Sequence, residues 1–166
     1  MARRSRATEN LKSHLPQNIL TFILYTKSKL EAKLYFTVPM ENISRKTVLL
    51  IDDEEYICKI VETCLEIFSD WQPVTVPCCE EGLAAVANIR PDAILLDMIM
   101  PNMDGFAFLK TLQANPEFAD IPVVLLTARV DLTESQKIAQ LGVKGAIAKP
   151  FNPVQIVSQI KHILDW

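Results

Sequence analysis

Short aliphatic runs alternate with longer segments of helical periodicity from residue 47 to the end of the chain. Apolar runs of about four to eight residues, bounded by turn residues, are typical of strands buried in a sheet. The predicted strands are Val48–Ile51, Trp71–Val76, Ala93–Leu96, Pro122–Leu126 and Ala146–Ala148. Pro73 has no backbone N–H to donate, so the second of these strands is expected at an edge of the sheet.

The segments between the strands have the three- and four-residue apolar spacing of amphipathic helices. Thr133 and Gln136 fit a capping box at the start of the fourth helix, and Gly142 is expected to end it. Asn152 offers an N-cap to the fifth helix, with Pro153 at its first position. The predicted helices span residues 57–68, 80–89, 106–112, 133–141 and 153–164.

Five strand–helix units in succession predict an α/β fold, a doubly wound five-stranded parallel sheet with helices on both faces. Right-handed crossovers leave few possible strand orders. The flavodoxin-like order 2-1-3-4-5 puts the strand that contains Pro73 at an edge and the three most apolar strands in the middle.

Charge divides the chain into two parts. Residues 1–39 hold seven Lys or Arg and two Glu, a net charge of +5, whereas residues 40–166 hold ten bases and eighteen acids, a net charge of −8. An acidic body argues against nucleic acid as a direct partner, because phosphate neutralisation dominates such binding. We therefore predict two regions, a basic extension over residues 1–43 and a folded domain over residues 44–166.

The remaining bulk features point to the cytoplasm and away from a membrane. The longest apolar stretch of the N-terminal part, residues 19–25, is too short to cross a bilayer, and no signal-peptide cleavage site follows it. Four cysteines lack the spacing of a zinc site, and we interpret them as reduced thiols in a cytoplasmic protein.

Polar side chains follow four of the predicted strands at the point where each strand ends. Asp52 and Asp53 follow the first strand, Asp97 the third, Thr127 the fourth and Lys149 the fifth. The carboxyl ends of parallel strands meet at one edge of the sheet, where ligands bind at the switch point. Clustered carboxylates repel one another unless a cation lies between them. Mg²⁺ suits such a set, because it binds one or two carboxylates and keeps coordination positions for water and a phosphate oxygen. A carboxylate nucleophile that forms an acyl phosphate is the chemistry that this arrangement suggests.

These motifs resemble those of the receiver domain of response regulators, the phosphoacceptor half of two-component signalling. The resemblance covers residues 46–166 and rests on four motifs in the family's order. They are Asp52-Asp53, the run Asp97-Met98-Ile99-Met100-Pro101-Asn102-Met103-Asp104-Gly105, Thr127-Ala128 and Lys149-Pro150-Phe151.

The resemblance implies a role for each of these residues. Asp97 is expected to be phosphorylated, and Asp53 to be a direct Mg²⁺ ligand. Asp52 is expected to act chiefly through water, and the backbone carbonyl of Ile99 to join the coordination. The residues expected to bind phosphoryl oxygens are Thr127 and Lys149, and the Lys149–Pro150 peptide bond is expected to be cis.

The expected function is that of a single-domain response regulator, because the chain ends at Trp166, directly after the fifth helix. A histidine kinase or a histidine phosphotransfer protein would donate the phosphoryl group. Phosphorylation-dependent docking to an unidentified protein would pass on the signal, so the protein is not expected to be an enzyme. Two alternatives stay open: a metal-dependent phosphohydrolase with an aspartyl-phosphate intermediate, and a pseudo-receiver that only binds.

Two features depart from the family pattern. Ala146 occupies a position where the family usually has Tyr or Phe, whose ring swings inward when the Thr moves toward the phosphate. A methyl group cannot report the position of Thr127 by changing rotamer. Residues 1–39 match nothing in the family. Either they are a disordered basic arm that contacts a partner, or translation starts at Met40 and the preceding 39 residues are an artefact of start-site choice.

Overall fold

The computed structural model describes residues 45–100 and 105–166, and the basic extension lies outside them. The described part contains a five-stranded parallel sheet with the order β2-β1-β3-β4-β5, so the predicted topology is confirmed. The strands are β1 (Thr47–Ile51), β2 (Gln72–Val76), β3 (Ala93–Asp97), β4 (Val123–Thr127) and β5 (Gly145–Ala148).

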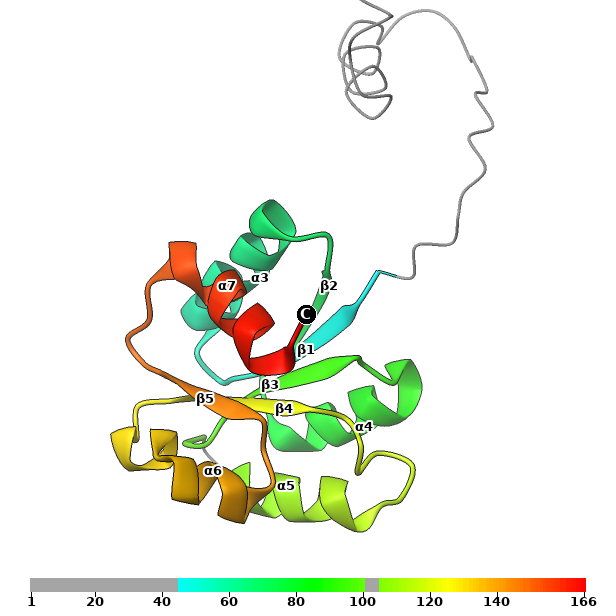
Figure 1. Ribbon diagram of the computed structural model, residues 1–166. Helices are drawn as coiled ribbons and strands as arrows, with labels where there is room; N and C mark the ends of the chain where they lie inside the picture. Colours follow the sequence, from blue (N-terminus) through cyan, green and yellow to red (C-terminus); the bar gives the residue numbers. More distant parts are fainter. Residues whose placement is uncertain (1–44, 101–104) are drawn as a thin grey trace, which may run out of the picture. The chain divides into compact units, whose positions relative to one another are not determined.

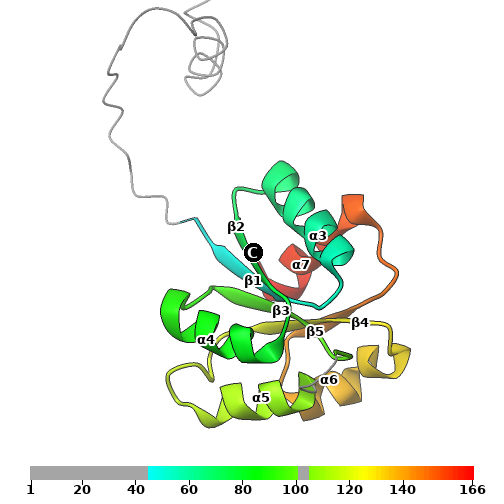
Figure 2. The ribbon, with the colours of Figure 1, turned by 180° about the vertical axis from the view of Figure 1, so that it is seen from behind.

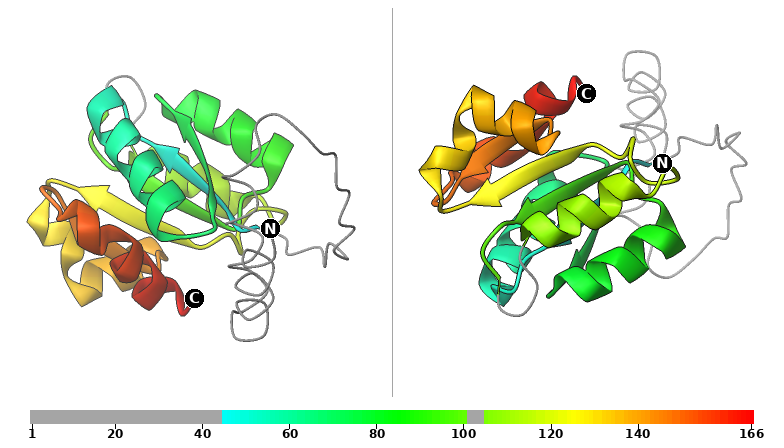
Figure 3. Two further views of the ribbon diagram at one scale, coloured as in Figure 1. Left: turned by 90° about the horizontal axis from the view of Figure 1, so that it is seen from above. Right: turned by 90° about the horizontal axis from the view of Figure 1, so that it is seen from below.

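Helices cover both faces of the sheet, as expected for a doubly wound fold. Figures 1 and 2 show α3 and α7 on one face and α4, α5 and α6 on the other, and Figure 3 gives the same two faces from above and below. No helix of the described part is both long and apolar enough to cross a bilayer. The helices are α3 (Glu55–Phe68), α4 (Cys79–Ile89), α5 (Gly105–Ala114), α6 (Ser135–Leu141) and α7 (Pro153–Leu164), with the 3₁₀ helix η1 (Val130–Thr133) before α6.

The three central strands supply both halves of the core. Successive residues of a strand point to opposite faces, so a strand covered on both sides must be apolar throughout. Leu49 and Ile51 of β1 belong to the cluster beneath α4 and α5, whereas Val48 and Leu50 belong to the cluster beneath α3 and α7. The alternation continues in β3, where Leu95 faces α3 and α7.

The helix ends agree with the sequence at two places and differ at one. The Asn152 side chain accepts a hydrogen bond from the Val154 N–H at 3.0 Å, and Gly142 ends α6 with a φ of 65°. The capping box predicted at Thr133 is wrong: α6 begins at Ser135, and Glu134 occupies the N-cap without a side-chain bond. The Thr133 hydroxyl instead donates to the Val130 carbonyl at 2.6 Å, within η1.

Two tryptophans meet at the amino-terminal edge of the sheet. Trp71, directly before β2, and Trp166, after α7, lie edge to face with ring centroids 4.9 Å apart and an interplanar angle of 83°. The Lys46 Nζ lies 4.2 Å from the Trp166 ring centroid, and the Lys161 Nζ lies 5.6 Å from the Trp71 centroid. This cluster fixes the end of α7 at the edge of the sheet opposite the strands' carboxyl ends.

Candidate functional site

Strand register brings Asp52 and Asp97 side by side at the carboxyl edge of the sheet. Ile51 of β1 pairs with Leu96 of β3, so the next residues, Asp52 and Asp97, are neighbours. By the alternation of side chains, both point to the α3–α7 face. Lys149 begins the connection from β5 to α7 and reaches the same place.

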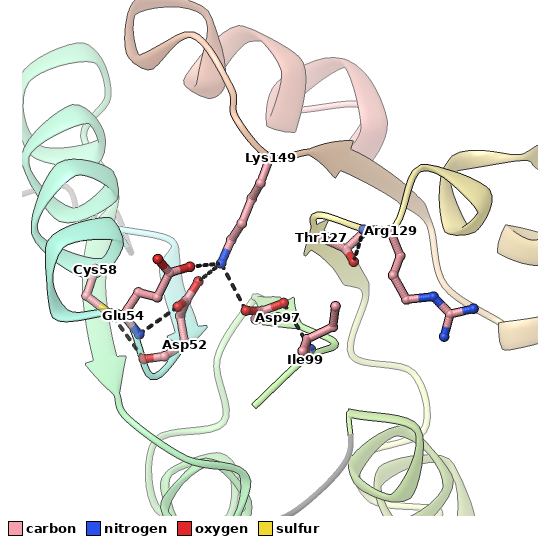
Figure 4. A network of polar contacts seen from close by, with 8 residues as sticks. All are labelled: Asp52, Glu54, Cys58, Asp97, Ile99, Thr127, Arg129 and Lys149. Carbon is pink, nitrogen blue, oxygen red and sulfur yellow. Dashed lines mark hydrogen bonds and ion pairs between the residues drawn. The ribbon is translucent and has the colours of Figure 1, made fainter. Parts of the chain in front are cut away.

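The Lys149 ammonium is the centre of a network with three carboxylates, shown in Figure 4. Its Nζ lies 2.7 Å from Asp52 Oδ2 and 2.9 Å from Asp97 Oδ2. A third contact, at 3.0 Å, goes to Glu54 Oε1. The sequence predicted that Asp52, Asp97 and Lys149 would converge, but Glu54 was missed.

Burial and ion pairing act in opposite directions on the charges of Asp52 and Lys149. Burial raises the pKa of Asp52, and the hydrogen bonds from Lys149 and the Glu54 N–H only partly oppose that rise. For Lys149 burial acts to lower the pKa, but hydrogen bonds to Asp52, Asp97 and Glu54 outweigh it and raise the pKa above its ordinary value. Lys149 therefore stays an ammonium ion at neutral pH.

Backbone N–H groups hold the two buried carboxylates in place. The Glu54 N–H donates to Asp52 Oδ1 at 2.9 Å, and the Ile99 N–H donates to Asp97 Oδ1 at 3.1 Å. Burial, with the nearby charge of Asp52, raises the pKa of Cys58 to about 11, so its thiol stays protonated and donates to the Asp52 carbonyl at 3.3 Å. Asp52 and Asp97 thus each accept a hydrogen bond from a backbone N–H on one carboxylate oxygen and from Lys149 on the other.

Gly105 allows the first turn of α5 to approach the end of β3. A Cβ at this position would lie 2.9 Å from the Asp97 carbonyl oxygen and 2.9 Å from the Met98 Cα. Real Cβ atoms essentially never come that close to backbone atoms. The glycine of the Asp104-Gly105 pair is therefore required by packing against the strand that carries Asp97.

Thr127 lies at the end of β4, fully buried, with its hydroxyl oxygen accepting the Arg129 N–H at 3.1 Å. The Arg129 side chain turns away from Asp97 in Figure 4 and pairs with Asp131 at 2.7 Å. Its guanidinium also lies near the Phe106 ring, 5.9 Å from the centroid. In this structure Arg129 therefore does not lie over the carboxylates.

The carboxylates provide the hard oxygen donors that Mg²⁺ prefers. Asp52, Glu54 and Asp97 each place an oxygen within 4.8 Å of the others, so the residues present fit a divalent cation. Asp53, the expected direct ligand, is exposed and lies outside this group. Its coordination, like that of the Ile99 carbonyl, stays a prediction. The Lys149–Pro150 peptide bond is cis, as expected.

Ala146 of β5 borders a groove between β5 and α7. The groove has a volume of about 480 Å³, and Thr133, Phe151 and His162 also line it. Ala146 itself is only partly buried, and no aromatic ring occupies its position. The place where the family usually has an aromatic ring is therefore part of this groove beside β5.

Comparison with known proteins agrees with this geometry. The family model of the response regulator receiver domain matches residues 48–161 of the chain. The chain belongs to this family. The receiver domain contains the carboxylate network, because Asp52, Glu54, Asp97 and Lys149 all lie within the matched residues.

Relatives and solved structures support the same assignment. The receiver is 32% identical over 122 residues to a probable transcriptional regulator, ycf27, of Cyanophora paradoxa, covering 74% of this chain and 49% of that protein. It is 29% identical to the phosphate regulon transcriptional regulatory protein PhoB of Pseudomonas aeruginosa, covering 72% of this chain and 52% of PhoB. The chain thus spans about half the length of the curated relatives it matches. Among solved structures, the chemotaxis response regulator CheY4 of Vibrio cholerae matches with a TM-score of 0.66 and 28% identity, over 72% of this chain and 99% of CheY4.

Proposed function

We propose that this receiver accepts a phosphoryl group on Asp97 and signals by docking to another protein in its phosphorylated state. The observation that carries the proposal is the buried Asp97 carboxylate, held 2.9 Å from the Lys149 ammonium beside a second buried carboxylate, Asp52. Such a carboxylate is a nucleophile in a fixed position, with a cation beside it for the incoming phosphoryl oxygens.

In the proposed transfer a carboxylate oxygen of Asp97 attacks the phosphorus of a phosphohistidine. The P–O bond forms as the N–P bond breaks, and the imidazole leaves with the electron pair and takes up a proton. Lys149 and the Thr127 hydroxyl donate hydrogen bonds to the phosphoryl oxygens. Mg²⁺ held by Asp52, Asp53, Asp97 and the Ile99 carbonyl would neutralise the negative charge on those oxygens.

A protein is the proposed donor, a histidine kinase or a histidine phosphotransfer protein. Four exposed apolar side chains follow the carboxyl ends of four different strands: Tyr56, Ile99, Val130 and Val154. Their side chains stay exposed, as expected for a surface that meets a protein partner. Exposed apolar side chains in the segments that follow these strand ends therefore support a protein donor.

The downstream partner is proposed to be a protein as well, in the cytoplasm. Residues 40–166 carry eighteen acids against ten bases, which disfavours direct contact of the receiver with nucleic acid. We propose that the receiver acts as a single-domain regulator, and the intact mass of the natural protein tests this.

Phosphoryl uptake is tested with acetyl phosphate and Mg²⁺, followed by intact mass measurement. The native protein is expected to gain the mass of one phosphoryl group, and an Asp97→Asn protein none. Asp120→Asn is the matched control, because Asp120 is an exposed aspartate of the loop before β4. It is expected to gain the phosphoryl group like the native protein.

The same experiment separates the alternatives. Continuous release of phosphate over many turnovers, without a stable phosphorylated species, would indicate a phosphohydrolase. The absence of any added mass in the native protein would indicate a pseudo-receiver that only binds. Undiminished labelling of Asp97→Asn would refute the assignment of Asp97.

A further inference from the structure

Lys149 has no donor left for a phosphoryl group in this structure. A lysine ammonium has three N–H donors. Its three carboxylate contacts, to Asp52, Asp97 and Glu54, match that number. A phosphoryl oxygen can therefore bind Lys149 only when one of these three contacts is released.

The three carboxylates differ in what release would cost. The Asp52 side chain is 0% exposed and that of Asp97 is 6% exposed, whereas the Glu54 side chain is 58% exposed. A buried carboxylate that loses its cation stays away from water, so the loss costs free energy. An exposed carboxylate is hydrated instead, so its loss of the cation costs little. Glu54 is therefore the partner that Lys149 releases most easily.

We propose that Glu54 is the exchangeable partner of Lys149. In the unphosphorylated protein Glu54 accepts the third N–H of the Lys149 ammonium, and in the phosphorylated protein a phosphoryl oxygen on Asp97 accepts it instead. The inference rests on the proposed function, and Glu54 acts in it as a positioning residue. It acts through Lys149 and touches neither Asp97 nor the phosphorus.

This role makes Glu54 a competitor of the phosphoryl group. Its carboxylate oxygen lies within 4.8 Å of oxygens of Asp52 and Asp97, so a phosphoryl dianion on Asp97 meets a nearby charge of its own sign. The contact with Lys149 stabilises the unphosphorylated state only. Removing the Glu54 carboxylate is therefore expected to stabilise the phosphorylated state relative to the unphosphorylated one. Removing a residue with a purely structural role would instead destabilise the phosphorylated state.

The test measures the affinity for beryllium trifluoride at saturating Mg²⁺, by calorimetry. This anion binds a carboxylate oxygen and reproduces the tetrahedral phosphoryl group without turnover. Glu54→Gln is expected to bind it about two- to fivefold more tightly than the native protein, the factor that corresponds to an exposed ion pair. Glu55→Gln is the matched control, because Glu55 is the exposed neighbour at the start of α3 and the loss of charge is the same. It is expected to bind much as the native protein does.

A second variant separates the contact from the charge. Glu54→Asp keeps the negative charge but withdraws the carboxylate from Lys149 by one methylene group. If the contact matters, this variant also binds beryllium trifluoride more tightly than the native protein. It also keeps the question open to test should Glu54→Gln fold poorly.

A measurement without metal gives an independent readout. The ¹⁵N shift of the Lys149 Nζ is expected to move in metal-free Glu54→Gln and to stay unchanged in Glu55→Gln. Equal affinities of Glu54→Gln and Glu55→Gln for the anion would overturn the inference, as would weaker binding by Glu54→Gln, which would place Glu54 at the metal. Failure of the native protein itself to bind would refute the proposed function, and the inference with it.

Discussion

The strands β1, β3 and β4 carry two kinds of buried position. In the middle of each strand the side chains are aliphatic, and at the carboxyl ends lie Asp52, Asp97 and Thr127, which are also buried. The two regions are equally shielded from water for different reasons. The hydrophobic effect holds the first, whereas Lys149 and backbone N–H groups hold the second.

The difference separates stability from chemistry within single strands. Burial of an aliphatic side chain lowers the free energy of the folded state, whereas burial of an ion pair often contributes nothing net, because desolvation offsets the attraction. Substitutions in the two regions should therefore have opposite profiles. Those in the middle should reduce stability, and those at the carboxyl ends should abolish chemistry.

Two positions of β3 that face the same side give the largest contrast. Leu95→Ala is expected to lower the free energy of unfolding by about 3–5 kcal/mol, because Leu95 is fully buried and a cavity remains. Asp97→Ala is expected to leave it unchanged or to raise it, since one of the crowded carboxylates disappears. Urea unfolding measures both. A comparable loss in the two variants would break the distinction between the regions.

Lys149→Met removes the cation that the carboxylates share. Metal-free stability is expected to fall by about 1–3 kcal/mol, because Asp52 and Asp97 lose a charged hydrogen-bond partner. Added Mg²⁺ should restore part of the loss, since it supplies a cation to the same carboxylates. Chemical unfolding with and without Mg²⁺ measures this, and the idea fails if Mg²⁺ stabilises the variant no more than it stabilises the native protein.

The stabilisation that Lys149 gives to the folded protein depends on pH with a definite sign. Because the folded pKa of Lys149 lies above its ordinary value of 10.5, the stabilisation is fully present below pH 10.5. It is lost as the pH rises through the higher folded pKa. The stability advantage of the native protein over Lys149→Met should therefore persist at neutral and mildly alkaline pH and shrink in strongly alkaline solution, as measured by urea unfolding of both proteins across this range.

Mg²⁺ affinity distinguishes the two aspartates that follow β1. Asp53→Ala is expected to weaken Mg²⁺ binding by about tenfold or more, because Asp53 is assigned direct coordination. Asp52→Ala is expected to weaken it less, since Asp52 is assigned a contact through water. Calorimetric titration of both variants measures the difference. Equal losses, or a larger loss for Asp52→Ala, would move the direct contact to the buried aspartate.

The smallest expected effect concerns the lifetime of the phosphorylated state. Ile99 is exposed beside Asp97 and has no group that could hydrogen-bond a water molecule. Ile99→Asn is therefore expected to speed phosphoryl loss several-fold, because an amide can position the attacking water. Decay followed by intact mass in both proteins measures this. Fast decay in the native protein, unchanged by the substitution, would leave Ile99 with a packing role alone.

The sequence predicted the sheet because its central strands are apolar at every position, a pattern that few folds share. It also placed Asp52, Asp97 and Lys149 correctly, since strand ends of a parallel sheet converge whatever the loops do. The prediction failed where a side chain had several possible hydrogen-bond partners nearby in the sequence. The Thr133 hydroxyl bonds within η1 and not to α6.

Glu54 was missed for a related reason. In the run Asp52-Asp53-Glu54-Glu55 it is indistinguishable from an acid that favours a helix start. Its role depends on a lysine 95 residues away, and only the folded structure shows that its carboxylate, and not that of Asp53, reaches Lys149. Tertiary contacts of exposed side chains have no periodic signal in a sequence.

The tryptophan pair has a consequence for spectroscopy. Trp71 and Trp166 are the only two tryptophans of the chain, and they lie edge to face at the edge of the sheet opposite Asp97. Intrinsic fluorescence of this protein therefore reports the attachment of the end of α7 and not the occupancy of the acidic site. An emission change on phosphorylation would show that the signal had crossed the domain to its far edge.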